Sequence, residues 1–154
     1  MAGLIILATN PSPSEQQSAH FMAALLRPNW TVVLKDPSGG RGGNTADLAI
    51  YTGGSTNNHA NDDDYENETQ TQPIDIYTPA RGTGGQAVAQ NVATKLSNQA
   101  PGGVCVDLSY IPPGSRAPIL ATLNNPNQLN VPRRAVVIVH ANGQQLGIIG
   151  VLPQ

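Results

Sequence analysis

The chain of 154 residues has one cysteine, one tryptophan, one phenylalanine and only eight lysine and arginine residues. A single cysteine excludes an internal disulfide and a thiolate metal cage. Few basic residues and a net charge of -2 argue against nucleic-acid recognition, since phosphate binding needs a clustered basic face. Scarce aromatic residues remove the stacking platforms that bases and sugars use.

Charged residues are also scarce, at 12% of the chain, about half the usual share. A surface with so few charges is typical of a protein that is partly covered in an assembly, so we expect a homo-oligomer. The apolar run at residues 4–8 is too short for a signal-peptide core or a membrane span. We expect a single domain, residues 1–154, made in the cytoplasm without a signal peptide and without membrane contact.

Two segments have the three-to-four-residue spacing of amphipathic helices. The first begins at the Ser-Pro-Ser-Glu motif of residues 12–15, which offers an N-cap serine, a proline at the first helical position and a glutamate at the third. Pro28 ends this helix. The second helix covers residues 85–98, where valine and leucine recur every four positions.

The remaining apolar runs predict β-strands, and Asn142-Gly143 is the dipeptide that best fits a tight hairpin turn. Together these elements predict an α/β (mixed α+β) fold, which is a single mixed sheet with two helices and a C-terminal β-hairpin. The expected strands cover residues 4–8, 30–34, 47–52, 73–78, 104–111, 119–123, 135–140 and 146–152.

The connection at about residues 53–72 is longer than an ordinary hairpin loop and holds half of all the acidic residues. We interpret it as a solvated acidic loop. Partner docking is one alternative, and cation binding is another, because hard cations take carboxylate oxygens as ligands. Its partner-contact candidates are Asp62, Asp63, Asp64, Glu66 and Glu68.

No complete catalytic motif accompanies this loop or any other segment, so we expect a protein that is not an enzyme and binds no cofactor. His20, His59 and His140 share no metal-binding spacing, and His59 in the polar loop is the best ligand candidate among them. Cys105 alternates with valines in a strand, which indicates a buried structural thiol.

The early helix, the strand pair joined by an acidic loop, the Pro79-Ala80 step into the second helix and the closing strands resemble tail-terminator and head-tail joining proteins of long-tailed bacteriophages. That resemblance implies a non-enzymatic virion structural protein that forms an oligomeric ring with other virion structural proteins. Sheet edges and loops lie between subunits in such rings. The composition allows a capsid cement or decoration protein equally well.

The element order over residues 4–140 is also similar to that of zinc-dependent N-acetylmuramoyl-L-alanine amidases, which cut peptidoglycan. Glu15 would match a glutamate ligand of that family, and His59 would match its histidine ligand within a His-Ala-Asn segment. The chain lacks the family's Gly-His-Gly turn after the first strand and its late catalytic glutamate. This alternative therefore implies a degenerate hydrolase without a complete zinc site.

Overall fold

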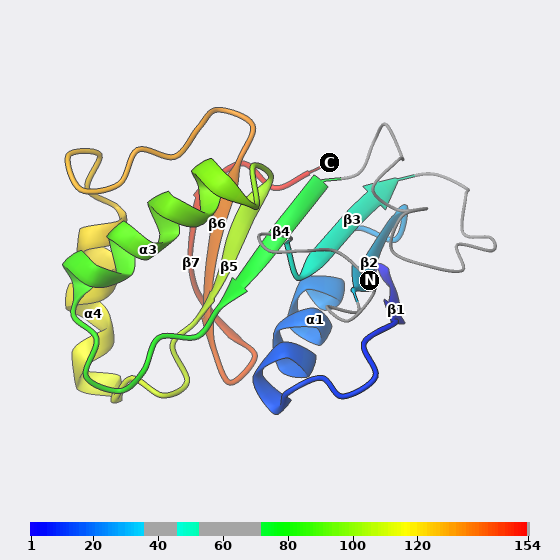
Figure 1. Cartoon of the computed structure of the whole chain (residues 1–154), viewed down its shortest axis with the longest axis horizontal. Coiled ribbons are helices and arrows are strands. Elements are labelled where there is room, and N and C mark those ends of the chain that lie inside the picture. Colours follow the sequence, from blue (N-terminus) through cyan, green and yellow to red (C-terminus); the bar gives the residue numbers. More distant parts are fainter. Residues whose placement is uncertain (36–45, 53–71, 154) are drawn as a thin grey trace.

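The computed structural model describes residues 1–35, 46–52 and 72–153, which form one seven-stranded sheet with three helices (Figure 1). Along the chain the elements are β1 (Gly3–Ile6), α1 (Pro13–Leu25), β2 (Trp30–Leu34), β3 (Leu48–Thr52), β4 (Gln72–Tyr77), α3 (Gly85–Asn98), β5 (Gly103–Asp107), α4 (Pro113–Leu123), β6 (Val136–Ala141) and β7 (Gln144–Gly150).

The strands lie side by side in sequence order, from β1 at one edge to β7 at the other. β4, β5 and β6 are parallel and are linked through α3 and α4, whereas β2, β3 and β4 pair antiparallel and β6 and β7 form the closing hairpin. The mixed α+β sheet with its C-terminal hairpin is therefore confirmed. The parallel unit brings the carboxyl ends of three strands to the same end of the sheet.

Helix α1 begins where the sequence predicts, because a capping box satisfies its first free N–H groups. The Glu15 N–H donates to Ser12 Oγ at 3.1 Å, and the Ser12 N–H donates to Glu15 Oε1 at 3.1 Å. Pro13 occupies the first turn, where its missing N–H costs no hydrogen bond.

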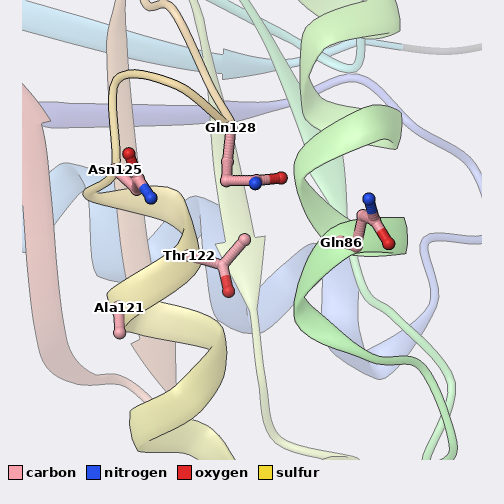
Figure 2. A pocket seen from close by; sticks show the side chains of 5 residues that line it. All are labelled: Gln86, Ala121, Thr122, Asn125 and Gln128. Carbon is pink, nitrogen blue, oxygen red and sulfur yellow. The ribbon is translucent and has the colours of Figure 1, made fainter.

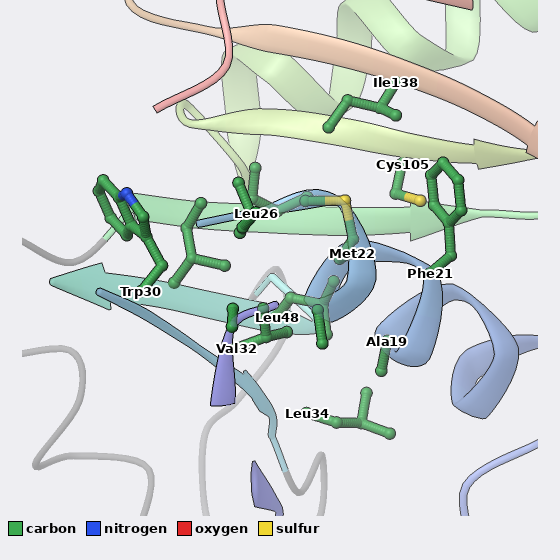
Figure 3. Close-up of a cluster of buried hydrophobic side chains, with 14 of the residues drawn as sticks. Ala19, Phe21, Met22, Leu26, Trp30, Val32, Leu34, Leu48, Cys105 and Ile138 are labelled. Carbon is green, nitrogen blue, oxygen red and sulfur yellow. The ribbon is translucent and has the colours of Figure 1, made fainter. Parts of the chain in front are cut away.

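The core has two layers, one on each face of the sheet. Figure 3 shows Met22 of α1 and Leu26, the C-cap residue of that helix, packed toward strand residues that include Leu48 and Cys105. On the other face, α3 and α4 cover the valines of β5 and β6. Cys105 is fully buried, as its position between valines indicates.

The hairpin turn is built as the Asn-Gly pair predicts, with φ of 52° at Asn142 and 81° at Gly143. Both residues need the left-handed backbone region, which asparagine and glycine adopt most readily.

The segment that was expected to be a strand at residues 119–123 belongs instead to a third helix, α4, so the prediction of two helices is wrong. Pro113 lies in its first turn, where proline favours a helix start. Ile119 and Leu123, four residues apart, form the buried stripe. The preceding strand also ends at Asp107 rather than at residue 111. None of the described helices has the length and apolar character that a membrane crossing requires.

Candidate functional site

Polar side chains gather at the carboxyl ends of the parallel strands, under the first turns of α1. Thr78 follows β4, Asp107 ends β5 and His140 lies near the end of β6, directly opposite Asp107 in the strand register. Helix α1 covers one face of the sheet here, and its Ser14 and Ser18 hydroxyl groups make hydrogen bonds with side chains of these strands. Ligand sites of α/β sheets are most often built at this end, so these side chains are the first candidates for a functional site.

Hydroxyl groups satisfy the buried carboxylate of Asp107. The Ser14 hydroxyl donates to Asp107 Oδ2 at 2.9 Å, and the Thr78 hydroxyl in turn donates to Ser14 Oγ at 2.6 Å. The other oxygen accepts the N–H of Ser109 at 2.9 Å as well as the Ser109 hydroxyl. These donors explain how a carboxylate with 1% exposure is accommodated without a cation beside it.

His140 is held in one neutral tautomer. The Gly143 N–H donates to Nδ1 at 3.2 Å, so the proton sits on Nε2, which donates to Ser18 Oγ at 2.9 Å. The ring also stacks on Phe21, with 4.5 Å between ring centroids. Burial lowers the pKa of His140, and the opposing charge of Asp107 raises it less. The imidazole is therefore uncharged at neutral pH.

Serine, histidine and aspartate are the residue types of a catalytic triad, but their arrangement here does not match one. A catalytic histidine must accept the serine proton, whereas His140 donates to Ser18. Both side chains have 0% exposure, so no substrate reaches them. The network therefore fixes α1 onto the sheet, and it is a structural feature that joins residues 122 positions apart.

A second polar cluster lies on the opposite face, under α3. Asp75 Oδ2 accepts the Lys95 ammonium at 2.5 Å and the Gln99 amide at 2.8 Å. Asp47 faces Asp75 across β3 and β4, and its carboxyl accepts the Ile76 N–H at 2.9 Å. Burial, followed by the hydrogen bond and the negative charge of Asp75, raises the pKa of Asp47 to about 8. Asp47 therefore keeps its proton at neutral pH. The pair of Asp47 and Asp75 then carries one net negative charge, which faces the Lys95 ammonium.

Neither of two cavities on the surface of the described residues is lined by an acid–base pair. The first, about 390 Å³, lies between α3 and α4 and is lined by Gln86, Ala121, Thr122, Asn125 and Gln128 (Figure 2). Its amides offer hydrogen bonds without charge. The second, about 290 Å³, runs from the loop after α4 to the end of β7 and has Arg133 as its charged residue.

The residues proposed from the sequence do not come together in the described structure. Glu15 closes the capping box of α1, and His20 is exposed on the same helix. His59 and the acidic residues Asp62, Asp63, Asp64, Glu66 and Glu68 lie outside the described residues. Within residues 1–35, 46–52 and 72–153, no three His, Cys, Asp or Glu side chains are grouped in a way that could hold a metal.

Sequence reasoning missed both polar clusters. A signal was present for one of them, because Asp47 directly precedes the apolar strand β3 and Asp75 lies within β4, and an acid beside buried apolar residues implies a partner. The pairing of Ser18 with His140 had no comparable signal, since each residue type is ordinary in its own segment.

The chain matches no protein-family model and no curated protein. Among solved structures, its fold is similar to a chain of the CdiA-CT/CdiI toxin and immunity complex from Burkholderia pseudomallei, with a TM-score of 0.55 and 22% identity. The match covers 97% of this chain and 100% of that one. At 22% sequence identity, this similarity shows that the two chains share a fold.

This match contradicts the expectation of a bacteriophage tail-terminator or other virion structural protein. The amidase resemblance gains no support either, since Glu15 serves as a helix cap. Both resemblances rested on element order and composition, which unrelated functions share. A strand was also expected from the sequence at residues 119–123, where α4 occurs.

Proposed function

We propose that this chain is the immunity member of a toxin–immunity pair, a binding protein that holds a toxic partner inactive and is not itself an enzyme. The observation that carries the proposal is the fold match, which extends over 97% of this chain and the whole of a chain in a toxin and immunity complex.

Within such a pair, the state of the polar residues favours the inhibitor over an enzymatic toxin. Reactive groups of an enzyme must lie open to substrate and near their partners in the reaction. Here Ser18 and His140 are sealed, and Asp107 is satisfied by hydroxyl donors. The cavities of the described residues present amides, apolar side chains and Arg133, which suit binding better than proton transfer.

The acidic segment of the sequence adds an electrostatic argument about the partner. Asp62, Asp63, Asp64, Glu66 and Glu68 remain predicted contacts, and together they would favour a partner with a basic surface. Self-association, expected from the low charge, is a separate proposal. It is tested by the mass of the free chain in native mass spectrometry.

The deciding experiment is a growth assay in a laboratory bacterial strain. Expression of this chain alone should leave growth unchanged. A tagged copy should retain a protein from cells of its source, and that protein, expressed alone, should arrest growth. Co-expression with this chain should then restore growth.

A matched control is Leu48→Asp, which puts a charge in the buried core and should abolish the rescue. Growth arrest by this chain alone would place it on the toxin side of the pair. A retained protein that is harmless when expressed alone would contradict the proposal.

A further inference from the structure

Strand β7 borders the sheet, and no strand of the described residues pairs with its outer edge. An open edge offers a row of unpaired N–H and C=O groups to another chain. Proteins usually protect such an edge with lysine, proline or an inward charge, yet β7 reads Gln-Gln-Leu-Gly-Ile-Ile-Gly and has none of these. This strand is therefore chemically ready to accept a further strand.

The second half of β7 is the regular part. Val139 pairs with Gly147 and His140 pairs with Gln145, so Leu146 is an extra residue that makes a bulge. From Gly147 to Gly150 the pairing with β6 continues without interruption. The bulge interrupts the first half of the edge, residues 147–149 remain regular enough for pairing, and Gly150, with φ of 95°, ends the extended backbone.

An apolar groove of about 290 Å³ lies at the end of this straight half. Val151, the residue that follows β7, lines it and is 76% exposed. The loop after α4 forms most of the groove. The apolar residues that line the groove are Leu123 at the end of α4, Leu129, Val131 and Pro132 in the loop, and Ile149 in β7. A strand added to β7 would be able to place a side chain here.

The charge around the groove has one sign. Arg133 lines it, is exposed, and makes no hydrogen bond or ion pair to another described side chain. From Leu108 to Gln154 the sequence contains three arginines and no aspartate or glutamate. The last carboxylate before this stretch, Asp107, is buried among its own donors. A side-chain carboxylate for Arg133 must therefore come from outside this part of the chain, and a guanidinium pairs with a carboxylate through two parallel hydrogen bonds.

We infer that the outer edge of residues 147–149 and the adjoining groove bind an extended segment of the protein partner. That segment adds an eighth strand, places an apolar side chain against Val151, and pairs an acidic side chain with Arg133. The inference rests on the proposed function for the identity of the partner. It adds the part of this chain to which the partner binds.

The first test uses a defined probe and the full chain. The probe is an acetylated peptide of alternating threonine and valine that ends in aspartate, and the control peptide ends in lysine. Amide NMR shifts on adding millimolar aspartate peptide should map to residues 147–151 and to Arg133. The lysine peptide, or the Arg133→Glu variant, should weaken binding by about fivefold, the upper end of what a lost exposed ion pair contributes.

Arg81→Glu is the matched control, because Arg81 is an exposed arginine on the connection between β4 and α3. It should leave peptide binding unchanged. The absence of shifts at residues 147–151, shifts confined to β1, or equal binding of both peptides would each overturn the inference.

The second test uses the growth-inhibiting protein that the wild-type chain retains. Val151→Asp and Arg133→Glu should each lower its affinity by about tenfold, or about 1.4 kcal/mol, because each introduces a carboxylate that repels the acidic segment at a partly desolvated contact. Circular dichroism should show unchanged folding, because both side chains are exposed.

The two proposals fail in different ways. If a toxic partner is found and both variants bind it as the wild type does, the docking site is wrong and the immunity function stands. If no toxic partner exists but the aspartate peptide binds the β7 edge, the function is wrong and the edge remains a docking site. A dimer of this chain that Val151→Asp dissolves would assign the edge to a second copy and overturn the inference.

Discussion

Replacing Asp47 with asparagine should stabilise the protein at alkaline pH and change it little at acidic pH. Asp47 accepts the Ile76 N–H at 2.9 Å and faces Asp75 across the strand pair. Burial comes first, and the neighbouring Asp75 second, among the causes that raise the pKa of Asp47 to about 8. Asparagine has nearly the shape of the protonated acid, keeps an acceptor for Ile76 and has an N–H for Asp75, but it does not titrate.

The sign follows from proton linkage. The unfolded chain has an aspartate pKa of about 3.9. Between that value and the folded pKa of about 8, the folded protein holds a proton that the unfolded chain has released. This contribution to stability is fully present below the unfolded pKa and is lost as the pH rises through the folded one. From about pH 6 to about pH 8 the loss due to Asp47 amounts to ~2 kcal/mol.

The assay is urea unfolding of the wild type and the Asp47→Asn variant at several values between about pH 5 and pH 9. The difference in unfolding free energy between the two proteins should grow in favour of the variant by about 1.4 kcal/mol per pH unit from about pH 5 to about pH 7, and it should level off above about pH 8. His140, whose pKa burial lowers, adds the same dependence to both curves and cancels in the difference.

The control is Asp75→Asn, which removes the negative charge that pairs with Lys95 and should destabilise the protein throughout this range. Parallel stability curves for the wild type and Asp47→Asn would refute the reasoning, because they would mean that Asp47 ionises in the folded state as it does in the unfolded chain.

Three further predictions follow from single contacts. Ser12→Ala removes the N-cap of α1 and should cost ~1 kcal/mol in urea unfolding, whereas Ser115→Ala, an exposed serine in the first turn of α4, should cost much less; equal losses would contradict the capping role. Lys95→Met leaves the buried Asp75 carboxylate without its cation and should cost ~3 kcal/mol, and a neutral effect would show that the ion pair contributes nothing. Burial raises the pKa of the Cys105 thiol to about 12, so a maleimide should label the folded protein only at the rate of its unfolding; labelling as fast as in urea would count against a sealed core.

The parts of the fold that follow from local chemistry were predictable from the sequence. The start of α1 depends on the capping box of Ser12 and Glu15, and the last hairpin depends on the backbone angles of Asn142 and Gly143. In each case the decisive residues are neighbours in the chain, so no tertiary contact was needed to recognise the element.

Helix α4 was missed because its sequence signal is short and mixed. It contains Pro118 and buries only Ile119 and Leu123, so the apolar residues resemble a brief strand as much as a helix face. The helix is favoured by tertiary contacts, since α4 packs against α3 and beside β7. Gly85 at the start of α3 makes this approach possible, because a Cβ there would lie 2.5 Å from Thr122 Oγ1.

The polar clusters were out of reach for a different reason. Ser18 and His140 are separated by 122 positions, and Asp75 and Lys95 by 20, so their meeting depends on the register of the sheet and on how the helices pack. The function prediction failed because the tail-terminator resemblance rested on element order, and the same order serves proteins with unrelated roles.

The contrast between the interior and the β7 edge has a consequence for function. Inside the described fold, Asp107, His140 and Asp75 all have partners, and their hydrogen bonds fix helices onto the sheet. At the β7 edge, backbone groups, an exposed Val151 and the Arg133 guanidinium are left without partners among the described residues. Binding free energy comes from groups that are unsatisfied before association, so variants of the interior should change stability and variants of the edge should change partner affinity. Measuring both quantities for His140→Phe and Val151→Asp separates the two roles, and a stability loss at the edge without loss of affinity would refute this division.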